Sequence, residues 1–169
     1  MRRRRSKTHP AASLPRTDRR IQEHEPDTYG TKGKLPDPTA CPSCGAMYRA
    51  GRWTWGSPPV DAHPTKCPAC RRIEDRHPAG LVVVEGEFAQ AHRGEIEARI
   101  RNVEEREKAE RPLKRIIAIA EREGGGFEVT TTDVHLARGI GEALHDAFQG
   151  ELEYRFAESD GLTRVHWRR

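Results

Sequence analysis

The chain has 169 residues, of which 33% are charged and only 34% hydrophobic, and its mean hydropathy of -0.88 is low. No apolar run approaches the roughly 20 residues of a membrane-spanning helix, and no apolar segment follows the basic start. We therefore expect a soluble, cytoplasmic protein without a membrane partner. The net charge of +4 is unevenly spread, because residues 1–40 hold 10 basic against 5 acidic side chains, residues 41–80 hold 6 against 3, and residues 81–169 hold 14 against 18.

The first part of the chain, residues 1–40, has no hydrophobic periodicity and contains five prolines. Its few large apolar side chains cannot offset the entropy of ordering it, so we predict a disordered basic tail. The run from Arg2 to Arg5 is suited to meet phosphates, which favours a polyanion as partner at this end of the chain. The alternative is a solvated tail with no specific use.

All four cysteines stand in two similar turns, Cys41-Pro-Ser-Cys44 and Cys67-Pro-Ala-Cys70. The pattern is C-x2-C-x22-C-x2-C, and two such pairs brought together form a tetrahedral thiolate site that suits Zn²⁺. We therefore predict a zinc ribbon over residues 41–80, with Cys41, Cys44, Cys67 and Cys70 as ligands of one structural zinc ion. The metal replaces the core that so small a unit cannot build.

Other uses of these cysteines are weaker interpretations. A disulfide framework needs an oxidising compartment, and no secretory signal begins the chain. A redox C-x2-C needs only one pair and lies between a strand and a helix. His63, four residues before Cys67, is a possible competing ligand, but four thiolates already fill a tetrahedral shell.

Cations and aromatic side chains alternate in the predicted ribbon. Arg49 and Arg52 lie among aromatic residues that include Trp53 and Trp55, and Arg71 with Arg72 follows the second cysteine pair. Such a surface suits RNA phosphates and bases, so the predicted RNA-binding residues are Arg49, Arg52, Trp53, Trp55, Arg71 and Arg72. The alternative for each tryptophan is that it covers the small ribbon.

Residues 81–169 are predicted to form a separate α+β domain. Residues 81–84 are a short β-type run, and residues 89–110 are helix-forming, with Ile96, Ile100 and Val103 at helical spacing. Residues 115–132 resemble a hairpin, Thr132 or Asp133 caps a second helix, and residues 151–156 and 162–167 alternate as strands. We predict an antiparallel sheet with two helices packed on one face.

Signatures of enzyme chemistry are lacking in the sequence, which has no phosphate-binding loop, no G-x-S-x-G and no H-E-x-x-H. The stretch from Arg138 to Gly141 resembles part of a dinucleotide-binding loop, but it falls inside the second helix, where close packing explains its glycines. His135 and His145 on that helix could form a polar site, although a charged solvent face is the simpler interpretation. We expect no catalytic activity and no small-molecule substrate.

Two stretches of the chain resemble a known group of proteins. The first joins both cysteine pairs with Gly51-Arg-Trp53, Arg71-Arg-Ile73 and Pro78-Ala-Gly80, and the second is Thr130 to Leu144. Together they are similar to short bacterial zinc-ribbon proteins related to the nonsense-mediated-decay protein three family. Eukaryotic members of that family are adaptors for nuclear export of the large ribosomal subunit. The resemblance implies a zinc module that touches ribosomal RNA or ribosomal proteins, beside an α+β domain.

The sequence therefore favours a non-enzymatic zinc-ribbon protein that binds RNA in association with the ribosome or its subunits. The alternative is a zinc-containing protein-interaction or regulatory module linked to DNA or transcription. A third hypothesis is an enzyme that uses the helix carrying His135 and His145.

Overall fold

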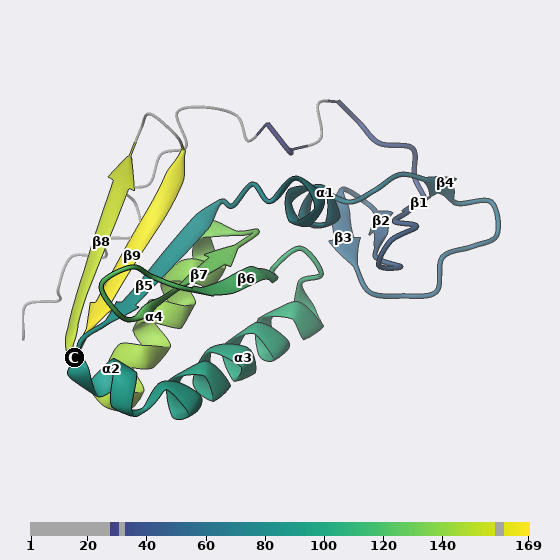
Figure 1. Cartoon of the computed structure of the whole chain (residues 1–169). Coiled ribbons are helices and arrows are strands. Elements are labelled where there is room, and N and C mark those ends of the chain that lie inside the picture. The colour runs from purple at the N-terminus through teal and green to yellow at the C-terminus, as the bar shows by residue number, and fades with distance from the viewer. Residues whose placement is uncertain (1–27, 31–32, 158–160) are drawn as a thin grey trace, which may run out of the picture.

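The computed structural model describes residues 28–30, 33–157 and 161–169 (Figure 1). Most of the predicted tail, residues 1–40, therefore lies outside the described residues. The described chain contains two sheets of different size. They confirm the predicted α+β class, with the four cysteines located before the larger sheet.

The smaller sheet has strand order β3-β2-β1-β4 and is followed by one helix. Its elements are β1 (Thr39–Ala40), β2 (Met47–Arg49), β3 (Arg52–Thr54), β4 (His63–Pro64) and the helix α1 (Pro68–Asp75). Strand β1 pairs antiparallel with β2 and parallel with β4. Since Thr39 is fully buried in this pairing, the small sheet begins just before the boundary predicted at residue 41.

The larger sheet has strand order β6-β7-β5-β9-β8, and its helices lie on one face (Figure 1). Its elements are β5 (Gly80–Glu85), α2 (Glu87–Ala91), α3 (Arg93–Glu110), β6 (Ile116–Glu121), β7 (Phe127–Thr131), α4 (Val134–Phe148), β8 (Glu151–Ala157) and β9 (Leu162–Arg168). The predicted hairpin and both C-terminal strands are present. The predicted first helix is divided into α2 and α3 at His92.

The larger sheet is mixed and not wholly antiparallel, because β5 and β9 run parallel. Burial explains why β9 takes the inner position. Its side chains Thr163, Val165 and Trp167 are all buried on the helix-covered face, whereas Tyr154 and Phe156 of β8 are about half exposed. An edge position for β9 would leave the Trp167 indole with a neighbour on only one side.

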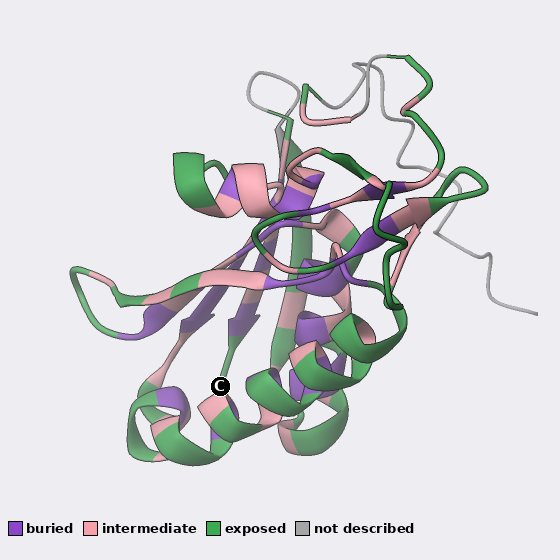
Figure 2. Ribbon diagram, turned by 90° about the vertical axis from the view of Figure 1, so that its right-hand side faces the viewer, coloured by how far each residue is buried: buried purple, intermediate pink, exposed green. Residues whose placement is uncertain are grey.

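The core lies between this sheet and the helices α3 and α4, where buried residues face one another (Figure 2). The predicted stripe of α3, Ile96, Ile100 and Val103, is buried in it. Helix α4 begins at Asp133, whose carboxylate accepts a hydrogen bond from the Leu136 N–H at 2.9 Å. This is the N-cap that the sequence predicted.

Two glycines of α4 have opposite surroundings. A Cβ at Gly141 would lie 2.5 Å from Val165 Cγ1, whereas a Cβ at Gly139 would have nothing within 4 Å. Close packing against β9 therefore accounts for Gly141. We expect Gly141→Ala to destabilise the chain by about 1–3 kcal/mol through overpacking, and Gly139→Ala to stabilise it by up to about 1 kcal/mol. Urea unfolding measures both, and equal effects would contradict the packing argument.

Candidate metal centre

The first cysteine pair occupies the turn between β1 and β2. Cys41 N–H donates to the Ala46 carbonyl at 2.8 Å, and Gly45 N–H donates to the Cys41 carbonyl at 2.9 Å. Gly45 has φ of +77°, a left-handed conformation that glycine adopts without a steric penalty. The short turn holds both thiols close to each other, with their Sγ atoms within 4.8 Å.

The second cysteine pair spans the beginning of α1. Cys67 is the N-cap residue, Pro68 occupies the first turn, and Cys67 Sγ accepts a hydrogen bond from Cys70 N–H at 3.4 Å. Proline suits this position because its missing N–H would have no partner inside the helix. Helix α1 was not predicted, because the eight-residue helix has only two buried side chains, Ala69 and Arg72.

The four thiols converge on one point. Their Sγ atoms all lie within 4.8 Å of one another, and Cys44 Sγ is 3.7 Å from Cys67 Sγ. A tetrahedral site with metal–sulfur bonds of about 2.3 Å requires sulfur–sulfur separations of roughly 3.8 Å. Cys41 and Cys67 are buried, whereas Cys44 and Cys70 are half-buried. The cluster therefore fits a metal ion held by four thiolates.

Backbone amides and burial act on these thiols in opposite directions. Burial raises the pKa of Cys41, but hydrogen bonds from the backbone of Cys67, Cys44 and Ser43 outweigh it and lower this pKa to about 6. The Cys67 N–H donor lies 3.2 Å from Cys41 Sγ. Burial raises the pKa of Cys67 and of Cys70. A metal ion at this point would favour the thiolate form of all four.

A buried arginine from the larger domain contacts three of the four sulfurs. Arg115 Nη2 lies 3.2 Å from Cys44 Sγ and 3.4 Å from Cys67 Sγ, and Arg115 Nη1 lies 3.3 Å from Cys70 Sγ. Its Nε donates to the Pro112 carbonyl at 2.7 Å. Burial lowers the pKa of Arg115, but the hydrogen bonds and negative charge of Cys70 and Cys44 outweigh it, so the pKa is raised. The guanidinium thus covers one face of the sulfur cluster.

Sequence reasoning missed Arg115, because nothing in a linear pattern connects it to Cys70, 45 residues earlier. The residue stands at the start of a strand and resembles any charged residue that flanks one. Its contact with Thr132 is closer in the chain and lies within the predicted hairpin, since the Arg115 N–H donates to Thr132 Oγ1 at 2.9 Å. The tertiary structure alone identifies Arg115 as part of the metal centre.

A second contact joins the two parts of the chain. Trp55 Nε1 donates to the Lys108 carbonyl at 2.6 Å, so the indole caps the last turn of α3. Leu113, which follows that helix, packs against the cysteine cluster together with Trp53. The cysteine cluster therefore lies at the junction of the small sheet and the α+β domain.

The six predicted RNA-binding residues have different surroundings. Arg49 and Arg52 are opposite each other at the end of the β2–β3 hairpin and are exposed. Trp53 is half-buried against the cysteines, and Trp55 remains 38% exposed beside α3. The pair Arg71 and Arg72 lies on α1.

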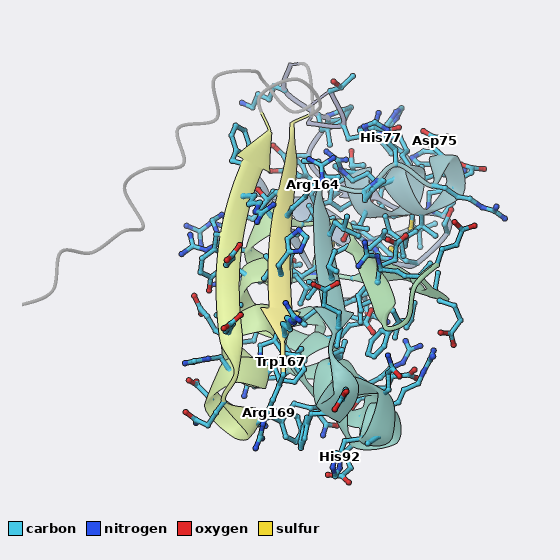
Figure 3. The ribbon with its side chains drawn as sticks, turned by 60° about the vertical axis from the view of Figure 1, so that its left-hand side comes forward. Asp75, His77, His92, Arg164, Trp167 and Arg169 are labelled. Carbon is cyan, nitrogen blue, oxygen red and sulfur yellow. The ribbon has the colours of Figure 1, made fainter. Side chains whose placement is uncertain are left out.

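Tyr29 engages both arginines of α1. Arg71 Nη2 donates to the Tyr29 carbonyl at 2.7 Å, and the Arg72 guanidinium lies 4.5 Å from the centre of the Tyr29 ring. The Tyr29 hydroxyl donates to Asp75 at 2.8 Å, and its ring stacks on His77 with centroids 5.4 Å apart. Figure 3 shows Asp75 and His77 together at this end of the molecule. Arg71 and Arg72 therefore hold a segment that precedes the ribbon.

The other candidate residues are not part of the cysteine cluster. His63 lies in β4 and is exposed. His135 is exposed on α4, and His145 Nδ1 lies 3.0 Å from the Gly150 carbonyl. The helix separates the two histidines by ten residues, which is about 15 Å of rise. They do not form a common site.

Comparison with protein-family models, curated proteins and solved structures finds no match to this chain. The resemblance to the ribosomal export adaptors stays a prediction. Among the described residues, no helix combines the length and the apolar character that spanning a membrane requires.

Proposed function

We propose that the four cysteines bind one Zn²⁺ ion as a structural centre, and that the small module presents a surface for RNA. The observation that carries the metal assignment is the convergence of four Sγ atoms within 4.8 Å. Four thiolates complete a tetrahedral shell, which leaves no position for water or substrate. The role of the ion is therefore to stabilise the fold, and we propose no catalytic activity for the chain.

The proposed RNA contacts lie at the end of the β2–β3 hairpin. Arg49 and Arg52 are exposed there, and no hydrogen bond or ion pair joins either side chain to another described residue. Their guanidinium groups are thus available for phosphates. The exposed part of Trp55 is the better candidate for stacking on a base, since Trp53 packs against the cysteines.

Salt dependence of binding tests this proposal. We expect Arg49→Ala/Arg52→Ala to lower the log-log salt slope of RNA affinity by roughly 0.7 for each phosphate that is no longer neutralised, which is the value for single strands. Fluorescence anisotropy with a ribosomal RNA fragment measures the slope. Arg101→Ala/Arg106→Ala removes the same charge from α3 and should leave the slope unchanged.

The ribosome is the first source of RNA to examine, because of the resemblance carried by the cysteine motifs. Sedimentation of a cell lysate through a sucrose gradient at low salt should place the protein with ribosomal subunits. A protein that stays at the top of the gradient and recovers no RNA would refute RNA binding. Complexes that survive nuclease would instead favour the alternative of a protein-interaction module.

A further inference from the structure

The edge strand β8 has the features of a surface that pairs with itself. It forms the outer edge of the larger sheet (Figures 1 and 3). Among the residues that the structure describes, its only hydrogen-bonding neighbour is β9. One row of its backbone N–H and C=O groups is therefore open to another strand.

The two edges of this sheet differ in how well they are protected against pairing with a further strand. At the opposite edge, the pairing of β6 with β7 contains a register shift between Ile116 and Ala118, a bulge that discourages further pairing. The pairing of β8 with β9 is regular over all seven residues from Glu151 to Ala157. Strand β8 also contains no proline. A long, regular edge of this kind is a template for another strand.

The side chains of β8 divide into an apolar and a charged set. Leu152, Tyr154 and Phe156 lie opposite residues on the helix-covered face of β9. Tyr154 is 46% and Phe156 47% exposed, and they are two of only four large hydrophobic side chains that are exposed in the described part of the chain. Glu153 and Arg155 lie on the other face, paired at 2.9 Å.

We propose that two copies of this chain associate through antiparallel pairing of β8 with β8 around a two-fold axis at Tyr154. The sequence Glu-Leu-Glu-Tyr-Arg-Phe-Ala is self-complementary about its centre. Each Glu153 then lies opposite Arg155 of the second copy, and each Leu152 lies opposite Phe156. The result is one continuous sheet that joins both copies, with the exposed aromatic rings covered by the second copy.

Charge selects this register over its neighbours. Opposite residues in an antiparallel pair lie on the same face, so a shift of one residue places apolar side chains against charged ones. A shift of the axis to Glu153 places this carboxylate opposite the Glu153 carboxylate of the second copy. A shift to Arg155 places the two Arg155 guanidinium groups opposite each other. Like charges directly opposite are destabilising, so the axis at Tyr154 is the favoured one.

Sedimentation equilibrium of the full chain tests the proposal. We expect the mass to rise with concentration from 19.1 kDa to twice that value. Glu153→Arg should weaken dimerisation at least tenfold, and Glu153→Arg/Arg155→Glu should restore it. Glu151→Arg is the matched control, because residue 151 lies opposite Ala157 and not opposite a charge. Circular dichroism checks that each variant folds.

Cysteine crosslinking tests the register independently. At the two-fold axis, Tyr154→Cys should form an intermolecular disulfide when a mild oxidant is added, because opposite Cα atoms in antiparallel strands are about 4.5–5.5 Å apart. Glu151→Cys should not, since its two copies would be about 20 Å apart along the strands. A chain that remains at 19.1 kDa at every concentration overturns the proposal, as does failure of the double charge reversal to restore the dimer.

Discussion

Cys67→Ser is expected to abolish stoichiometric zinc binding and to unfold the small module. Cys67 is fully buried and its sulfur lies 3.7 Å from the Cys44 sulfur, so its replacement removes one of the four proposed ligands, whereas serine can still cap α1. Binding of a structural zinc ion contributes roughly 10–16 kcal/mol to the free energy of folding. The free energy of unfolding of a whole domain is about 5–15 kcal/mol, which is of the same size. Mass spectrometry of bound metal measures zinc loss, and trypsin cleavage at Arg72, which is buried in the folded module, measures unfolding.

Ser43→Ala provides the matched control for this variant. Ser43 lies exposed in the same turn as Cys41 and Cys44, and its side chain is not a ligand. This variant should retain one zinc ion per chain and the protease resistance of the parent. Treatment of the parent chain with a chelator should reproduce the Cys67→Ser phenotype. A Cys67→Ser protein that keeps its zinc and resists trypsin would contradict a four-cysteine structural site.

Arg115→Met is expected to weaken zinc binding by about 10- to 100-fold, the usual effect of removing a group that supports metal ligands. Four thiolates around Zn²⁺ leave two negative charges in a partly buried site. Arg115 contacts three of the four sulfurs and is itself only 8% exposed. Methionine retains much of the side-chain volume and removes both the charge and the N–H donors. Competition with a chromophoric chelator measures the affinity.

Two further variants separate charge from geometry. Arg115→Lys keeps a positive charge but cannot reach three sulfurs with a planar fork, so its zinc affinity should lie between those of the parent and Arg115→Met. Arg106→Met removes an exposed charge from α3 and should change nothing. Equal affinity in all four proteins would show that Arg115 has no electrostatic role in holding the metal.

The position of Arg115 connects the cysteine cluster with the larger domain. Its backbone N–H is bound to Thr132 and its side chain reaches the cysteines, while Trp55 crosses in the other direction to α3. Removal of the metal should therefore loosen the contact between the two parts as well as the small sheet. This arrangement explains why so small a sheet can present Arg49 and Arg52 in a defined place relative to the α+β domain.

Much of the larger domain was predictable because its signals are local. The helical spacing of Ile96, Ile100 and Val103 predicted α3, and Thr132 or Asp133 was predicted to cap α4, which has Asp133 as its N-cap. Strands β8 and β9 alternate cleanly. Their order in the sheet was not predictable, since alternation shows that a strand has two faces and does not specify its neighbour. The parallel pairing of β5 with β9 depends on which strand buries more apolar surface.

The candidate metal site also has a part that was predictable from the sequence and a part that was not. Its ligands were predicted because each C-x2-C pair is a local motif whose spacing has one common chemical use. The partners of Arg71, Arg72 and Trp55 were not predictable, because each contact joins residues far apart in the chain. Trp53 packs against the cysteines, as the alternative for the tryptophans had it. The contact of these side chains with RNA stays a prediction, and in this structure Arg71 and Arg72 engage Tyr29.

The sequence by itself determined that four thiols form one site, that an α+β domain follows, and that positive charge gathers at the N-terminal end. The tertiary structure alone decided that Arg115 faces the cysteines, that Trp55 caps α3, and that β8 forms an open edge. The physical reason is the distance along the chain over which each kind of signal acts. Ligand spacing, helix periodicity and strand alternation act over a few residues, whereas charge compensation and edge exposure depend on which distant segments the core brings together.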